Sequence, residues 1–446
     1  MIIRSICFSG ILLCTNPAFA DQLNLNDAIN LSSATQPPAS NSSAVVPIHA
    51  SMTDHLTLEQ VVKLAAQHAP QVQAERYRQE AATADSDRAG RLPDPQLQFG
   101  TQNLDMQGSG AFNPNADAMT MRFVGVSQDI PSSAARAAEQ AKAHANQGAA
   151  AADTQEARFR AKRDAATAWV DLWVAQRAET LLMHLLDQNQ VAIDVARARL
   201  TGANGTVTDV LAARAASVEL DNQLEAIRGA EQEAYAALAR WVGPAIGHVS
   251  LSAPPDFSQL PVPETRLLQK LDIQAPLLSW ASRVSIAEAD LQRAKASKQP
   301  DWTVGFSYGL RAPGLPALGT FQIGMRLPLF ADHRENRDID ARHADLEAVR
   351  ADREDARRAQ TEIVERSLAR WQSLSAQVLR DESTLLPLAS DRTRTALAAY
   401  RGGGSLEPWL VARSAEIGAN LSYINMLAAR ARAWTELAYL IPENLQ

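Results

Sequence analysis

The sequence predicts a mainly helical protein of two similar halves, with a β portion made of four strands of membrane-spanning length. Three observations indicate this fold class. Long stretches rich in Ala, Glu, Arg, Gln and Leu contain few Gly or Pro and favour very long helices. Several motifs recur about 200 residues apart, which indicates a duplication. Four short segments have the apolar and polar alternation of membrane strands, and two of them alternate almost perfectly over ten residues.

The composition excludes several classes of protein. The 446 residues carry a net charge of −7 and are 46% hydrophobic, which is enough apolar content for a large core. Because no stripe is rich in Lys and Arg, we expect no nucleic-acid partner. Eighteen apolar residues never run together after the N-terminal segment, so we expect no transmembrane helix. The sequence holds no GxSxG, HExxH or Walker motif, and its His residues are scattered. We therefore predict no enzyme, no cofactor and no metal site.

The N-terminus is typical of a secretory signal peptide. Arg4 supplies a basic start, Ile6 to Leu13 form a short apolar core, and an A-x-A pattern ends at Ala20. We therefore predict that residues 1–20 are a signal peptide.

Both cysteines, Cys7 and Cys14, lie inside this signal, so the mature chain would have none. That excludes disulfides and thiolate metal sites. Lipidation of Cys14 is an alternative, although the bulky Leu13 before it is unlike lipoprotein signals. Residues 21–55 are rich in Asn, Ser, Ala and Pro without a period, which indicates a flexible segment.

The duplication divides the mature chain into a first repeat at 56–263 and a second repeat at 264–446. Each half is expected to contain a helix, two strands, a very long helix, a Gly turn and another helix. The motifs that recur are Ala69-Pro70 as Ala275-Pro276, Pro93-Asp94 as Pro300-Asp301, and Arg214 as Arg413.

Helices are expected at 57–90, 132–200 and 206–242 in the first half, and at 264–298, 332–400 and 406–440 in the second. Each of the two longest would span roughly 100 Å. Because proline lacks an N–H group, Pro70 and Pro276 should kink or restart their helices and Pro387 should bend its helix.

Strands are expected at about 92–104 and 119–131 in the first half, and at 302–311 and 320–329 in the second. An apolar face and a polar face over 9–11 residues match what a membrane strand needs. In the first half we expect Leu97 and Phe99, then Met119, Met121 and Phe123, to form the apolar face. The lipid-facing residues of the second half would be Trp302, Val304, Phe306, Tyr308, Phe321, Ile323 and Met325.

Aromatic residues in these strands could form a belt at the lipid interface, and the candidates are Trp302, Tyr308 and Phe123. The alternative is an ordinary hairpin that packs on helices. If the strands do cross a bilayer, four cannot close a barrel, because unpaired backbone groups in lipid cost several kcal/mol each. Two chains would give eight strands and a filled interior, whereas three would give twelve and leave a conduit.

Several segments together resemble the TolC-type outer-membrane efflux family, over roughly residues 56–442. They are LPDPQLQFGTQNL (92–104), MTMRFVGVSQDIP (119–131), the two Gly turns and the duplication itself. The resemblance implies a homotrimer with a twelve-stranded β-barrel in the outer membrane and a periplasmic tunnel of α-helical hairpins. Residues 103–131 further resemble the heavy-metal (cobalt-zinc-cadmium/copper) branch that serves resistance–nodulation–division pumps. At 132–140 the chain departs from relatives, which tend to carry Gly and Lys there.

The two Gly turns would lie at the far periplasmic end of this tunnel and would also cap helices, with Thr206 or Ser405 as the N-cap. By resemblance, the contact with a periplasmic adaptor protein would be made by Gly202, Gly205, Thr206, Gly402, Gly404 and Ser405. A pore constriction near these turns would use Glu407, with Asp209 in the analogous place, and carboxylates around an axis would attract cations. The alternative for Glu407 is a solvated helix N-terminus.

The sequence therefore predicts a passive exit duct in the outer membrane, fed by an inner-membrane pump and carrying heavy-metal cations. Two alternatives stay open. One is a duct for drugs or other small molecules, and the other is a periplasmic coiled-coil scaffold whose hairpins pack on helices.

Overall fold

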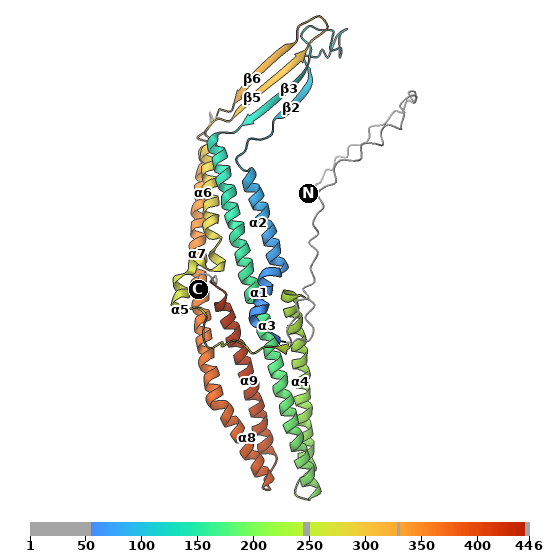
Figure 1. Cartoon of the computed structure of the whole chain (residues 1–446), viewed down its shortest axis with the longest axis vertical. Coiled ribbons are helices and arrows are strands. Elements are labelled where there is room, and N and C mark those ends of the chain that lie inside the picture. The colour runs from blue at the N-terminus through green and yellow to red at the C-terminus, as the bar shows by residue number, and fades with distance from the viewer. Residues whose placement is uncertain (1–54, 244–249, 328–330, 442–446) are drawn as a thin grey trace, which may run out of the picture. The chain divides into compact units, whose positions relative to one another are not determined.

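The fold consists of long antiparallel helices joined to a small antiparallel sheet (Figure 1). The computed structural model describes residues 55–243, 250–327 and 331–441, all within the unit Thr53–Gln446. The predicted signal peptide at 1–20 and residues 21–54 lie outside the described residues. Among the described residues, no helix combines the length and the apolar character needed to cross a membrane.

The first half of the described chain starts with a two-residue strand, ends with two long helices and carries two sheet strands between them. Its elements are β1 (His55–Leu56), α1 (Leu58–His68), α2 (Pro70–Arg88), β2 (Gln96–Gln102), β3 (Met121–Ile130), α3 (Ser133–Thr201) and α4 (Val207–Val242).

The second half has the same order of long elements but more interruptions. Its elements are β4 (Ser250–Leu251), α5 (Glu264–Gln269), the 3₁₀ turns η1 (Leu271–Ile273) and η2 (Ala275–Leu277), α6 (Trp280–Ala296), β5 (Trp302–Leu310), β6 (Leu318–Met325), α7 (Glu335–Arg380), the π-turn η3 (Asp381–Leu385), α8 (Leu386–Arg401) and α9 (Glu407–Ala438).

Prolines break the helices where the sequence predicts it. Ala69 has the extended ψ angle of 130°, α1 ends before it, and Pro70 opens α2 as its first residue. In the long helix of the second half, a π-turn at Asp381–Leu385 interrupts the α-helical pattern just before Pro387, which has no N–H group to donate.

The helix expected at 264–298 with a kink or restart at Pro276 is interrupted over a longer stretch than predicted. The chain instead forms the short helix α5 and two 3₁₀ turns before α6 begins at Trp280. Gln274 is extended and fully buried, and its side-chain amide donates to the Leu267 carbonyl at 2.6 Å and accepts from Gln360 at 2.7 Å. These bonds, followed by Pro276, hold the backbone out of a helix.

The helix α3 is the central element of the bundle. It packs against α1, α2, α4, α6 and α9, while α7 packs against α6 and α9. Its first turn is capped by the Ser132 hydroxyl, and the Ser132 N–H donates to the Asp301 carboxylate at 2.9 Å. The Pro-Asp motif of the second half therefore ties the start of α3 to the start of β5.

The main core contains two tryptophans in equivalent places. Trp169 in α3 donates its indole N–H to the Leu56 carbonyl at 3.1 Å, and Trp371 in α7 donates to the Phe257 carbonyl at 3.0 Å. The two donors are 202 residues apart and the two acceptors 201. This spacing matches the shift of about 200 residues between the sequence motifs.

Candidate functional site: a two-faced sheet and two linked helix turns

The four long strands form one antiparallel sheet in the order β2-β3-β5-β6 (Figure 1). Opposed residues in an antiparallel pair point to the same face of the sheet. One row across all four strands is Leu97, Val126, Phe306 and Phe321, and every member is apolar. Leu97 is 66% exposed, Phe306 56% and Phe321 65%, so none of the residues that the structure describes covers this face at these positions.

The remaining second-half residues predicted to face lipid lie on this same apolar face. In the register Trp302 opposes Met325 and Val304 opposes Ile323, and Tyr308 is two residues from Phe306 on its strand. Val304 is partly buried and the others are exposed. The prediction that they share one face is thus correct, while their contact with lipid stays a prediction.

The opposite face carries mainly small and polar residues, with Met121 and Phe123 as exceptions. The row next to the apolar one consists of Gln98, Gly125, Ser307 and Thr320. Thr303 also belongs to this face, and its hydroxyl donates to the Asp129 carboxylate at 2.8 Å. The sheet therefore presents two chemically different surfaces.

Phe123 lies on the wrong face for the predicted aromatic belt. It opposes Gly309, whereas its neighbour Val124 opposes Tyr308 and shares the apolar face. Its ring covers Gly100 of β2, where an added Cβ would lie 3.4 Å from the Phe123 Cε1 atom. A glycine on the partner strand thus gives a large side chain room on the polar face. Met121, also predicted apolar-facing, is on this face too and covers Gly309.

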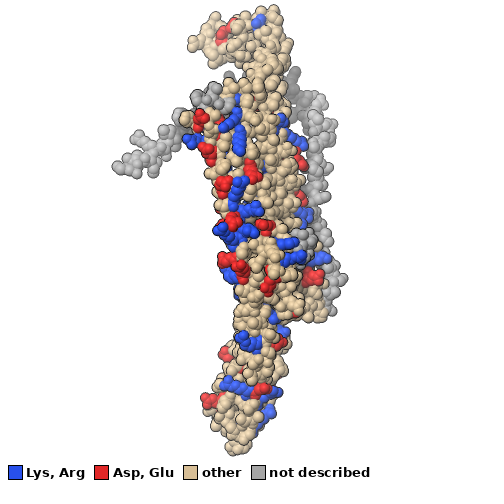
Figure 2. All heavy atoms as spheres, turned by 90° about the vertical axis from the view of Figure 1, so that its left-hand side faces the viewer, with Lys and Arg blue, Asp and Glu red and all other residues tan. Residues whose placement is uncertain are grey.

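The strands β2 and β6 are the two edges of this sheet, with seven and eight residues. An edge strand presents a row of N–H and C=O groups that no strand of the same sheet satisfies. Charged residues are rare on the sheet, since within the four strands only Arg122 and Asp129, both in β3, are charged. Figure 2 shows the contrast with the helical part, where side chains of both signs are frequent.

The turn between α3 and α4 contains the first group of predicted contact residues. Thr206 caps α4, because its hydroxyl accepts from the Asp209 N–H and the Asp209 carboxylate accepts from the Thr206 N–H, both at 3.1 Å. Asp209 is thus part of a capping box. Gly205 packs so tightly that an added Cβ would lie 3.0 Å from Arg199 Cβ, while Gly202 forms the C-cap of α3.

The turn between α8 and α9 is built differently. Gly402 forms the C-cap of α8, and Gly403 has a φ of +109°, which side chains strongly disfavour. The prediction that Ser405 caps α9 is wrong. Leu406 occupies the N-cap, makes no side-chain capping bond and is 1% exposed, because it is buried in a cluster with Tyr400 and Trp409. Glu407, the predicted constriction residue, is exposed in the first turn of α9.

Arg199 links the two turns. Its guanidinium donates to the Asn204 carbonyl at 2.8 Å in its own turn, and to the carbonyls of Tyr400 and Gly404 (3.1 Å) in the other. The guanidinium carbon also lies 4.3 Å from the centre of the Tyr400 ring, in a cation–π contact. Burial and then the Asp209 carboxylate raise the pKa of Tyr400 against the opposing effect of Arg199.

Arg199 was not among the predicted site residues. Its acceptors in the second turn lie 201 and 205 residues away in sequence, so no local pattern could reveal them. The one available signal was its position three residues before the conspicuous Gly202. The structure brings the two predicted Gly turns together through this side chain.

The fold of this chain, a four-stranded sheet joined to very long helices, is similar to that of the Campylobacter jejuni CmeC outer membrane channel, with a TM-score of 0.72 at 12% identity over 86% of this chain and 84% of that one. A family model described as outer membrane efflux protein matches residues 61–244. A comparison with curated protein sequences gave no match. The chain is thus similar to outer membrane efflux proteins over residues 61–244, and its fold resembles that of solved outer-membrane proteins.

Three solved structures illustrate the shared fold. A membrane protein from Pseudomonas aeruginosa is 17% identical with a TM-score of 0.73, covering 86% of this chain and 92% of that one. CusC, whose structures concern transmembrane channel formation, is 16% identical with a TM-score of 0.73 and the same coverage of both chains. The outer membrane protein VceC from Vibrio cholerae is 18% identical with a TM-score of 0.69, covering 86% and 94%. Because these three proteins are only 16–18% identical to this chain, their similarity shows a shared fold.

The link through Arg199 predicts that removing it loosens both turns. In Arg199→Ala the bonds to three carbonyls disappear, and hydrogen bonds to a charged donor stabilise by about 1.5–3 kcal/mol. We therefore expect amide hydrogen exchange at 198–206 and 399–406 to become about tenfold faster.

The matched control is Arg197→Ala, two residues earlier on α3, where the removed side chain only makes an exposed ion pair with Asp194 at 3.7 Å. This variant should exchange like the wild type at both turns. Equal exchange rates in the two variants would show that Arg199 does not join the turns.

Proposed function

We propose that this chain is one subunit of a passive exit duct in the outer membrane. The observation that supports the proposal best is the sheet, which has one exposed apolar face, one small and polar face, and two unpaired edges. A surface of this kind fits a wall between lipid and a water-filled lumen. In this proposal the apolar face of the sheet contacts lipid, and the polar face lines the lumen through which solutes pass.

The open edges support assembly from identical copies. Four strands are too few to form a closed wall, and the smallest membrane barrels use about eight. A homotrimer would supply twelve strands and a conduit, in agreement with the resemblance drawn from the sequence. In this proposal β2 of one copy pairs with β6 of the next, so that no backbone group faces lipid unpaired.

The duct would work with two further proteins. The turns at 202–206 and 402–405 are exposed ends of helix pairs, and we propose that they contact a periplasmic adaptor. The driving force would come from an inner-membrane pump of the resistance–nodulation–division type. The chain itself would bind no nucleic acid and catalyse no reaction.

The proposed cargo is heavy-metal cations, which rests on the resemblance of residues 103–131 alone. Drugs or other small molecules are the alternative cargo. Deletion of the gene, followed by susceptibility tests with copper, zinc, cobalt, cadmium and nickel and with a panel of dyes, separates the two. If the deletion strain becomes sensitive to metals alone, the cargo is heavy-metal cations. If it becomes sensitive to dyes alone, the cargo is drugs or other small molecules.

A periplasmic scaffold is the remaining alternative. Such a protein would bury the apolar face of the sheet against its own helices. The exposure of Leu97, Phe306 and Phe321 speaks against this arrangement.

Two neighbouring residues of β6 test the orientation of the sheet. Ile323→Arg places a charge on the apolar face, where it costs about 2–4 kcal/mol near the middle of a bilayer, whereas Gln322→Arg places it on the polar face. We expect Ile323→Arg to lower the yield of heat-modifiable trimers in the outer-membrane fraction severalfold and Gln322→Arg to leave it unchanged. Equal yields for both variants, or a wild type that is soluble without detergent, would contradict the proposed duct.

Glu407→Ala tests the constriction. If three copies of this carboxylate surround the lumen, their removal should raise single-channel conductance in planar bilayers by at least about 1.5-fold, or weaken block by cations. Asp391→Ala is the control, because this exposed aspartate is held in an ion pair with Arg394 on its own helix. Conductance and block that stay at wild-type values in Glu407→Ala would remove this residue from the constriction.

A further inference from the structure

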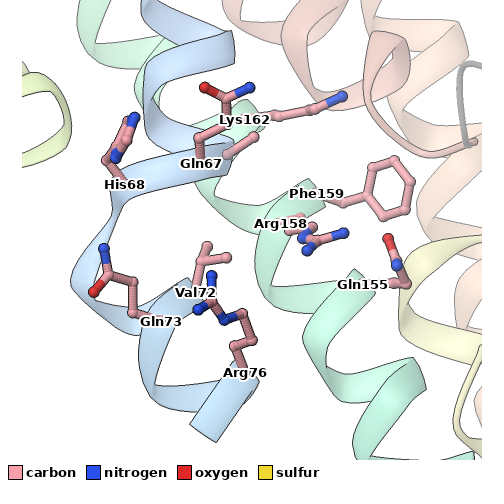
Figure 3. A pocket seen from close by; sticks show the side chains of 10 residues that line it. Gln67, His68, Val72, Gln73, Arg76, Gln155, Arg158, Phe159 and Lys162 are labelled. Atoms are coloured by element: carbon pink, nitrogen blue, oxygen red, sulfur yellow. The ribbon is translucent and has the colours of Figure 1, made fainter. Parts of the chain in front are cut away.

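A hollow of about 670 Å³ lies beside the break between α1 and α2, against α3 (Figure 3). The break at Ala69-Pro70 lies beside it, since residues on both sides of the break line the hollow. Its floor is apolar, since Val72 of α2 is 3% exposed and Phe159 of α3 is 8% exposed. The hollow is thus lined by three helices, α1, α2 and α3, on both sides of a proline break.

Basic and neutral side chains line this hollow without an acidic one among them. Arg76 extends from α2 and Arg158 from α3, and His68 lies at the end of α1 (Figure 3). Lys162 lies near the Phe159 ring, with its amine 5.8 Å from the ring centre. The positive charges therefore come from separate helices that the fold brings together.

Arg158 is the key side chain of this hollow. It is partly buried, yet it forms no hydrogen bond or ion pair with any residue that the structure describes. Its neighbour Arg160 has such a partner, Glu156. Arg76 pairs with Glu80 at 3.4 Å, but both side chains are 60% exposed and such a pair contributes little. An anion in the hollow would give Arg158 the partner it lacks.

The start of α2 adds positive potential at the same place. The N-terminal end of a helix carries a partial positive charge. The N-cap Ala69 offers no side-chain acceptor, and the first turn of α2 has no acidic residue. By contrast, α1 has a capping box and Glu59 in its first turn. The N-terminus of α2 is thus left without the usual internal anion.

We propose that this hollow is a binding site for a phosphate group, with Arg158 and Arg76 as its main ligands. The planar guanidinium of arginine matches the oxygens of a phosphate in a two-point hydrogen bond, which favours Arg over other cations for this task. The apolar floor of Val72 and Phe159 would receive the organic part of a phosphate ester. The site goes beyond the proposed duct and does not depend on it, because its ligand set comes from one chain.

The test is isothermal titration calorimetry of the full chain in detergent, with inorganic pyrophosphate and with glycerol 3-phosphate as probes. We expect wild-type binding that weakens as the salt concentration rises. Arg158→Gln should weaken binding about tenfold or more, since bonds to charged groups are the strong ones. Pyrophosphate binding alone indicates a free phosphate compound, and glycerol 3-phosphate binding of similar strength indicates a lipid headgroup. Both results support a phosphate site.

Arg160→Gln is the matched control, because it removes the same charge two residues along α3 from a side chain that does not line the hollow. It should change the dissociation constant less than about twofold. If circular dichroism shows that Arg158→Gln does not fold, Arg76→Gln takes its place in the test. The Arg76 side chain is exposed, so its replacement should not disturb the core.

Absence of binding by the wild type would overturn the proposal, as would equal weakening by Arg158→Gln and Arg160→Gln. Dissociation of the oligomer by Arg158→Gln without any effect on probe binding would also overturn it, because Arg158 would then serve contacts between copies. The yield of trimers from the β6 variants is independent of these outcomes, so the two proposals fail separately.

Discussion

The unpaired backbone at the two edges of the sheet is the constraint on which the rest of the account depends. Each N–H or C=O group left without a partner in hydrocarbon costs several kcal/mol, and β2 and β6 each present a whole row of them. The apolar row of Leu97, Val126, Phe306 and Phe321 makes the same sheet unsuited to water on that side. In the proposed duct, a neighbouring copy at each edge would pair the backbone groups, and lipid would cover the apolar row.

The helical part is organised so that the two halves are joined at both of its ends. Near the sheet, the N–H of Ser132 donates to the Asp301 carboxylate, which connects the start of α3 with the start of β5. At the other end, Arg199 connects the α3–α4 turn with the α8–α9 turn. Between these points, Trp169 and Trp371 make the same bond about 200 residues apart. The contacts of Ser132, Arg199 and Trp371 join the two halves of the chain along the length of the helical part.

Local patterns predicted much of this fold. The bounds of α3 and α4, the break at Pro70 and the cap at Thr206 follow from proline chemistry, side-chain capping and helix propensity, which act within a few residues. Features set by distant residues were missed. Gln274 breaks a helix by bonding across the core to Gln360, Leu406 displaces Ser405 from the cap because it is buried, and Phe123 lies on the polar face because Gly100 of the neighbouring strand makes room. The roles of Arg199 and Arg158 likewise depend on helices that only the fold brings together.

Covalent trapping of neighbouring copies tests the shared wall most directly. The two native cysteines, Cys7 and Cys14, lie in the predicted signal peptide and can be replaced by Ser. A pair such as Gln98→Cys in β2 and Thr320→Cys or Gln322→Cys in β6 can then be introduced. These residues lie on opposite edges of one sheet, so a disulfide between them must join different copies. We expect an oxidised covalent trimer from membranes for at least one pair, and monomers for each single variant. Monomers from every pair, in protein extracted from membranes, would contradict the shared wall.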